Sequence, residues 1–166
     1  MKEKIRIILI GLCLIGIDQA IKWIIISNFN LFDSNSIIPN FFSLTYVRNT
    51  GAAFSILEGR ISFFVLLSIA ILIYFIYFLF RIKTIKLGYQ IVYSLLLGGI
   101  IGNLIDRIFY GAVIDYLDFQ FGTYQFAIFN FADICIVVGG ILLFLLMWKE
   151  ETHEIYYRRR ERNQKD

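Results

Sequence analysis

The uninterrupted apolar run ISFFVLLSIAILIYFIYFLF, residues 61–80, decides the fold class, because a helix needs about 20 such residues to span a bilayer. Similar runs lie at residues 5–26, 87–105 and 126–148, and they are too long and too numerous to be buried strands. The chain is 58% hydrophobic, with a mean hydropathy of +0.70, and 17% charged, whereas soluble domains are about 25% charged. This composition excludes a disordered chain, a coiled coil and an ordinary soluble domain. We therefore predict a polytopic α-helical membrane protein with four transmembrane helices in a single membrane domain, residues 1–166.

Basic residues flank the predicted spans unequally, and this asymmetry predicts the orientation. Most of the 16 Lys and Arg residues lie before residue 7, between residues 81 and 86, or after residue 148. Both termini are therefore predicted to be cytoplasmic, with outer loops at residues 27–60 and 106–125 and a cytoplasmic tail at 149–166. The run Arg158–Arg160 lies beside a membrane span, so anionic lipid headgroups are a nearer partner for it than nucleic acid, and a simply solvated tail is the favoured alternative; we expect no nucleic-acid partner.

Both outer loops contain strand-like patterns. Bulky apolar and small polar residues alternate over residues 42–47, ahead of the turn-like residues 48–51. A second candidate strand lies between Gly111 and Gly122. Together with aromatic residues that include Phe54, these segments are predicted to form a small extracytoplasmic β-sheet, a cradle that rests on the outer leaflet.

Ionisable side chains inside apolar spans are costly and therefore mark candidate functional positions. At a rise of about 1.5 Å per residue, Asp18 falls in the outer half of the first span. Lys22 lies one turn further on the same helix face, so the two are expected to form an ion pair. Asp106 lies at the outer end of the third span, next to Arg107, where pairing or helix capping accounts for it.

Three further aspartates have no basic residue within four positions. Asp115 and Asp118 lie in the loop between the third and fourth spans, and Asp133 lies near the outer end of the fourth. An aspartate without a partner in apolar surroundings has a raised pKa, and two such groups held close share one proton, which gives an acid and a base near neutral pH. Asp133 is the strongest candidate for a catalytic residue and Asp115 its expected partner. Ion binding and polar helix pairing remain the alternatives.

The sequence lacks the motifs of several other chemistries. It contains no His-Glu-x-x-His motif, no Cys/His cluster and no Gly-x-Ser-x-Gly element, so we expect neither a metal site nor a cofactor. Cys13 and Cys135 lie within apolar runs and are interpreted as small hydrophobic residues. A small membrane transporter or proton channel that uses buried acidic residues is the alternative to an enzyme.

A series of short motifs nevertheless favours one enzyme family. In chain order they are Asp18-Gln19-x-x-Lys22, Asn49-x-Gly51-Ala52-Ala53-Phe54, Gly98-Gly99-x-x-Gly102-Asn103-x-x-Asp106-Arg107, Val113-x-Asp115 and Phe129-Asn130-x-Ala132-Asp133. In these motifs and in the number of spans, the chain resembles bacterial lipoprotein signal peptidase, also called signal peptidase II. The resemblance implies an aspartyl endopeptidase of the bacterial cytoplasmic (inner) membrane. It would cleave prolipoproteins immediately before the diacylglyceryl-modified cysteine, near the extracytoplasmic face.

The resemblance also assigns roles to residues. Asp115 and Asp133 match the catalytic pair of the family, in agreement with the pairing argument. The residues expected to orient this pair, hold the helices together or contact the substrate are Asp18, Lys22, Asn49, Gly51, Asn103, Asp106, Arg107 and Asn130. Inhibition by globomycin-type cyclic peptides and a mobile segment over the site are also implied, and we expect a monomer. Tyr116 and Ala127 stand where the family commonly has Phe and Pro, which affects local loop geometry.

Overall fold

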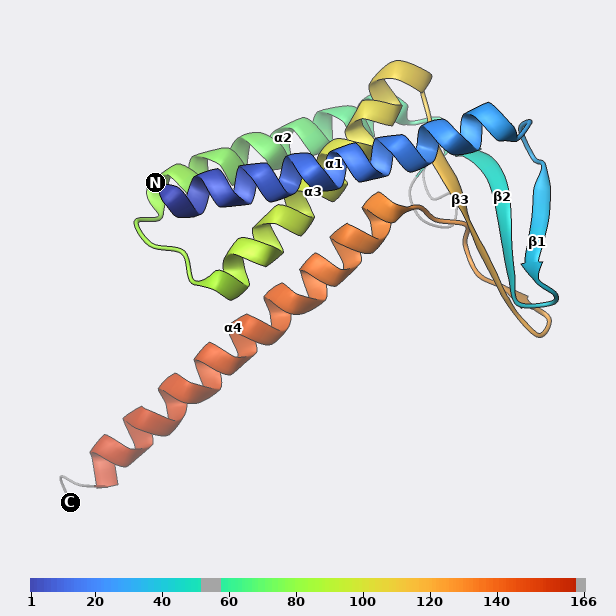
Figure 1. Ribbon diagram of the computed structural model, residues 1–166. Coiled ribbons are helices and arrows are strands. Elements are labelled where there is room, and N and C mark those ends of the chain that lie inside the picture. The colour runs from blue at the N-terminus through green and yellow to red at the C-terminus, as the bar shows by residue number, and fades with distance from the viewer. Residues whose placement is uncertain (52–57, 164–166) are drawn as a thin grey trace.

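The computed structural model describes residues 1–51 and 58–163, which form a bundle of long helices and one small sheet. The helices are α1 (Lys2–Asn28), α2 (Ile61–Arg81), α3 (Leu87–Tyr110) and α4 (Phe131–Asn163). The strands are β1 (Ser34–Ile38), β2 (Phe42–Asn49), β3 (Val113–Phe121) and β4 (Tyr124–Gln125). In Figure 1 the sheet lies at one end of the bundle, and the start of α1 and the end of α4 lie away from it. The predicted fold class, four apolar helices with a small antiparallel sheet, is confirmed.

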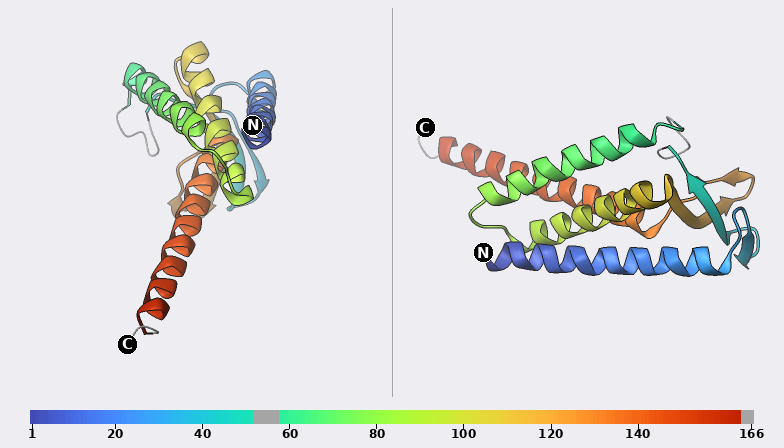
Figure 2. Two further views of the ribbon diagram at one scale, coloured as in Figure 1. Left: turned by 90° about the vertical axis from the view of Figure 1, so that its left-hand side faces the viewer. Right: turned by 90° about the horizontal axis from the view of Figure 1, so that it is seen from above.

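Helix α3 is the centre of the bundle. Helices α1 and α4 pack along it, and α2 packs mainly on α3 from the outside (Figure 2). Glycines on α3 allow this close approach. A Cβ added at Gly98 would lie 2.8 Å from the Cβ of Leu14 on α1, and one added at Gly99 would lie 2.5 Å from the carbonyl oxygen of Ala132 on α4. A larger residue at either position would therefore force the helices apart.

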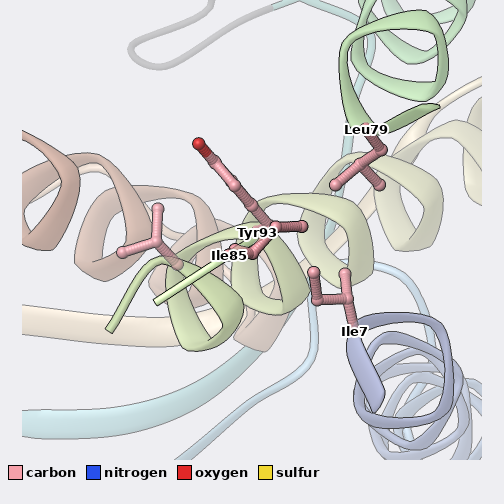
Figure 3. Packing of buried hydrophobic residues seen from close by; sticks show 5 residues of the cluster. Ile7, Leu79, Ile85 and Tyr93 are labelled. Atoms are coloured by element: carbon pink, nitrogen blue, oxygen red, sulfur yellow. The ribbon is translucent and has the colours of Figure 1, made fainter. Parts of the chain in front are cut away.

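A hydrophobic cluster joins three helices at the end of the bundle far from the sheet. Its members include Ile7 of α1, Leu79 of α2 and Tyr93 of α3, which Figure 3 shows on their three helices. Ile85, just before α3, belongs to the same cluster, and its backbone N–H donates to the Glu3 carboxylate at 2.8 Å. In a lipid surround the close packing of such side chains, rather than their removal from water, holds helices together, so this cluster attaches helix α2 to α1 and α3.

The outer surface of the bundle is strongly apolar. All four helices are long and apolar enough to cross a membrane. On α2, for example, Leu66 is 67% exposed and Ile73 is 64% exposed. Contiguous apolar surface on this scale is unusual for a soluble monomer and suits a lipid surround.

The sheet is antiparallel throughout, in the order β1-β2-β3-β4. The predicted strands are confirmed: β2 begins at Phe42, and β3 lies between Gly111 and Gly122, which both adopt left-handed backbone conformations, with φ of 66° and 62°. In the register between β2 and β3, Val47 lies opposite Asp115. Phe54, expected to join this cradle, falls outside the described residues.

The fourth helix starts and ends later than the predicted span at 126–148. Its first residue is Phe131, because the preceding residues pair with the sheet instead. Leu117 and Phe129 form an antiparallel bridge, with Leu117 N–H donating to the Phe129 carbonyl at 2.8 Å and Phe129 N–H donating back at 3.1 Å. At its other end α4 continues through part of the expected tail, to Asn163. Helix α3 similarly extends five residues into the expected outer loop at 106–125, to Tyr110.

Candidate active site

A buried ion triad joins α1 to α3 near the sheet. Lys22 Nζ lies 2.9 Å from Asp18 Oδ2 and 2.6 Å from Asp106 Oδ2, and all three side chains are buried. The pair expected between Asp18 and Lys22 is present. Asp106 pairs with Lys22 rather than with its neighbour Arg107, and its second role is to accept a hydrogen bond from the Ile114 N–H at 3.2 Å. The attraction between opposite charges at these distances offsets the cost of removing each charge from water.

Lys22 also fixes the orientation of Asn103. Its ammonium donates to Asn103 Oδ1 at 3.1 Å, and an ammonium can only donate. The amide nitrogen of Asn103 therefore points away from Lys22, and it donates to Asp133 Oδ1 at 2.7 Å. The buried charge on α1 thus sets the direction of a hydrogen bond to the candidate catalytic carboxylate on α4.

Asp133 is held by a capping box at the start of α4. Asn130 Oδ1 accepts a hydrogen bond from the Asp133 backbone N–H at 2.9 Å, and Asp133 Oδ2 accepts one from the Asn130 backbone N–H at 3.2 Å. This reciprocal pairing of the N-cap residue with the third residue of a helix satisfies two backbone N–H groups that have no partner within the helix. With Asn103, it engages both carboxylate oxygens of Asp133.

Asp115 lies on β3, and 2% of its surface is exposed. Its Oδ2 accepts a hydrogen bond from Asn49 Nδ2 of β2 at 3.1 Å, and its Oδ1 accepts one from Asn130 Nδ2 at 2.6 Å. Burial, reinforced by the charge of Asp133, raises the pKa of Asp115 to about 7. A carboxyl group in this state takes up and releases a proton near neutral pH.

Asn130 bridges the two candidate catalytic aspartates. Its side-chain nitrogen binds Asp115, while its side-chain oxygen and backbone nitrogen both bind Asp133. The same side-chain nitrogen also donates to Asn103 Oδ1 at 3.1 Å. One fully buried residue therefore sets the position of a strand carboxyl group relative to a helix carboxyl group.

Arg107 connects this centre to the segment that follows β2. Its guanidinium donates to the Gly51 carbonyl at 3.2 Å and lies 5.1 Å from the ring centroid of Phe64 on α2. The Gly51 N–H donates in turn to Asn49 Oδ1 at 2.9 Å, which leaves the Asn49 amide nitrogen directed at Asp115.

The structure brings all ten of the predicted site residues into one hydrogen-bonded and ion-paired network. They are Asp18, Lys22, Asn49, Gly51, Asn103, Asp106, Arg107, Asp115, Asn130 and Asp133. Asp118 is engaged elsewhere, accepting from the Thr45 hydroxyl at 2.8 Å. The residues Ala52, Ala53 and Phe54 of the second motif, and the segment expected to move over the site, fall outside the described residues.

Two contributors to this network were not among the predicted site residues. Gln19 Nε2 donates to Asp106 Oδ1 at 3.0 Å and to the Gly102 carbonyl at 3.2 Å. Its position next to Asp18 in the first motif was the available signal. The Tyr116 hydroxyl accepts a hydrogen bond from the Phe131 N–H at 3.2 Å. The spacing of residues along the chain does not predict this contact between Tyr116 and Phe131.

The two carboxyl groups suit the chemistry of a shared proton. They are fixed by the same residue, each accepts amide hydrogen bonds on both oxygens, and the charge of Asp133 acts on Asp115. Two carboxyl groups held close together can share one proton, which leaves a base beside an acid. The fold and this site define a class: a helical membrane protein with two aspartates bridged by one buried asparagine near one end of its bundle.

Comparison with known proteins assigns the family. Residues 10–149 match the family described as Signal peptidase (SPase) II. The chain is 39% identical to the lipoprotein signal peptidase of Staphylococcus aureus (strain JH9), over 89% of this chain and 90% of that protein. A bacterial membrane enzyme solved by the in meso method at 2.3 Å superimposes with a TM-score of 0.82 at 38% identity, covering 89% of this chain and 90% of the other. Another, solved at 1.9 Å, gives a TM-score of 0.76 at 39% identity, covering 85% and 91%. The chain belongs to the signal peptidase II family.

Proposed function

We propose that this chain removes the signal peptide of prolipoproteins, cutting immediately before the diacylglyceryl-modified cysteine, with Asp115 and Asp133 as its catalytic pair. The observation that carries this assignment is the bridge made by Asn130, which binds both carboxyl groups through separate atoms. Two aspartates held in this way on different elements have a fixed separation. That is the requirement for acid and base to act on one peptide bond.

Hydrolysis then proceeds by general acid–base catalysis. The ionised aspartate takes a proton from a water molecule as the water oxygen attacks the scissile carbonyl carbon. The protonated aspartate donates a hydrogen bond to the carbonyl oxygen and afterwards supplies its proton to the leaving amine. The pair titrates as a unit. Because the pKa of Asp115 lies at about 7, cleavage should decline above that pH as the shared proton is lost.

The supporting residues act on this pair from three sides. Lys22 orients Asn103, which holds Asp133. Asn49 holds Asp115 from β2. Arg107 keeps a positive charge beside the pair and connects it to the backbone at Gly51, where we expect the substrate to pass.

We place the protein in the bacterial cytoplasmic membrane as a multi-pass protein, with both termini cytoplasmic and the site near the extracytoplasmic face. The basic residues at the helix ends far from the sheet support this orientation. The signal-peptide helix would enter sideways from the bilayer, with the diacylglyceryl chains remaining in lipid. The fully buried charged side chains, Asp18, Lys22, Asp106 and Asp115 among the described residues, lie at the sheet end. A conducting path would need such groups through the other half as well.

Globomycin-type cyclic peptides are expected to compete with the substrate for the aspartate pair, and the protein is expected to act as a monomer. Both expectations can be tested in the cleavage assay, by titrating the inhibitor and by measuring the mass of the active species in detergent.

The test is a gel-shift assay in detergent with a diacylglyceryl-modified prolipoprotein as substrate. Wild type should cut before the lipidated cysteine, and Asp115→Asn and Asp133→Asn should not. Asp118→Asn is the matched control, because Asp118 lies three residues from Asp115 on β3 and binds Thr45 instead. It should cut like wild type. Cleavage by a folded Asp133→Asn protein would refute the assignment of the pair.

A further inference from the structure

The first turn of α4 is capped by groups from three different parts of the chain. The leading N–H groups of a helix have no partner within it and must find one elsewhere. The Phe131 N–H donates to the Tyr116 hydroxyl at 3.2 Å, and the Ala132 N–H donates to Asp18 Oδ1 at 3.0 Å. The Asp133 N–H donates to Asn130, as described above. The turn that carries Asp133 is therefore fixed by β3 and α1 as well as by its own N-cap.

Tyr116 is placed to couple the two aspartates. It follows Asp115 directly on β3, is 3% exposed, and packs in a cluster with Ile25, Tyr46 and Ile114. Its backbone N–H donates to the Phe129 carbonyl at 3.1 Å, so both the backbone and the hydroxyl of this residue hold the segment that leads into α4.

We propose that Tyr116 is a positioning residue whose hydroxyl fixes the first turn of α4 against β3 and thereby sets the separation of Asp115 from Asp133. This inference rests on the proposed function. A phenylalanine at this position would fill the same space but offer no acceptor to the Phe131 N–H. The hydroxyl is thus the group through which β3 holds the first turn of α4.

The tyrosine remains a neutral hydroxyl while it does this. Burial, together with the nearby carboxylates of Asp18, Asp133 and Asp115, raises the pKa of Tyr116 above its usual value. The group therefore accepts the hydrogen bond without adding a negative charge beside the catalytic pair.

The experiment compares Tyr116→Phe with Tyr46→Phe in the prolipoprotein cleavage assay. Tyr46 belongs to the same cluster and is 4% exposed, but its hydroxyl accepts from Arg48 Nε at 2.8 Å and does not touch α4. We expect Tyr116→Phe to lower kcat about tenfold with KM unchanged, which corresponds to about 1.4 kcal/mol. Tyr46→Phe should stay within about twofold of wild type, since it removes an equivalent hydroxyl from the same core.

A second pair of variants tests the bond itself. Proline has no N–H and is favoured at the first position of a helix, so Phe131→Pro removes the donor. In that background, Tyr116→Phe should change kcat less than about twofold, because the bond is already absent. The full effect in both backgrounds, unchanged kcat in Tyr116→Phe, or equal losses in Tyr116→Phe and Tyr46→Phe would overturn the inference. Asp133→Asn is run alongside: an active Asp133→Asn would contradict the proposed function, whereas an inactive one beside a fully active Tyr116→Phe contradicts only this inference.

Discussion

Replacing Asp115 by asparagine should reverse the order of stability between variant and wild type as the pH rises from about 4 to about 8. Burial, with the charge of Asp133, raises the pKa of Asp115 from its ordinary 3.8 to about 7. A carboxyl group with a raised pKa stabilises the folded protein fully below its unfolded pKa, and this contribution is lost as the pH rises through the folded value. The window therefore runs from about pH 4 to about pH 7.

The magnitude follows from the same two values. Their difference corresponds to about 4 kcal/mol of folding free energy lost by wild type across the window. The variant does not titrate and so does not lose this free energy, but its side-chain amide has only one accepting atom. That oxygen can accept the hydrogen bond from Asn130 or the one from Asn49 but not both, and the lost hydrogen bond costs about 1 kcal/mol. Asp115→Asn should thus be about 1 kcal/mol less stable than wild type near pH 4 and about 3 kcal/mol more stable near pH 8.

Unfolding in mixed detergent micelles, followed by circular dichroism at a series of pH values, would measure both proteins. Asp118→Asn controls for a general effect of removing a carboxylate from β3 and should show no crossing. Asp133→Asn removes a charge that raises the pKa of Asp115, so the loss of stability should shift to lower pH. Two curves for wild type and Asp115→Asn that run parallel across the window would refute the reasoning.

Three further outcomes are expected. Lys22→Met leaves Asp18 and Asp106 buried without their shared cation, which should cost about 3–5 kcal/mol in the same unfolding measurement; a loss below about 1 kcal/mol would contradict the ion triad. Gly99→Ala should destabilise by about 1–3 kcal/mol because α3 must move off α4, and unchanged unfolding would show that the helices do not meet there. EDTA should leave prolipoprotein cleavage unchanged, whereas inactivation that zinc reverses would argue for a metal-dependent mechanism.

Much of the fold could be predicted from the sequence because it depends on length and hydropathy. The run at residues 61–80 is long enough to span a bilayer and contains no charge, so it has few alternatives to a membrane helix. The first residue of α4 was harder to predict from the sequence. Residues 126–130 are as apolar as the helix that follows, and only their pairing with Leu117 of β3 and the cap at Asn130 end the helical pattern there.

In the candidate site, too, some contacts could be predicted from the sequence and others could not. The grouping of Asp18 with Lys22 follows from their spacing on one helix face, and that pair is present. The partner of Asp106 does not follow, because adjacency in sequence suggested Arg107, while the packing of α1 on α3 delivers Lys22 instead. Contacts between elements depend on register and helix rotation, which residue spacing alone does not contain.

The charges around the site bear on the protonation of the proposed aspartate pair. Lys22 pairs with both Asp18 and Asp106, so the ion triad as a whole carries one net negative charge and does not neutralise the pair. Arg107 lies beside the pair, and its guanidinium donates to the backbone carbonyls of Asn103 and Gly51. Arg107 can therefore balance one negative charge on the pair, whereas a second would be left unbalanced in a buried region, where that is costly. Under the proposed mechanism the pair therefore retains one proton between Asp115 and Asp133, which is the state that the proposed hydrolysis requires.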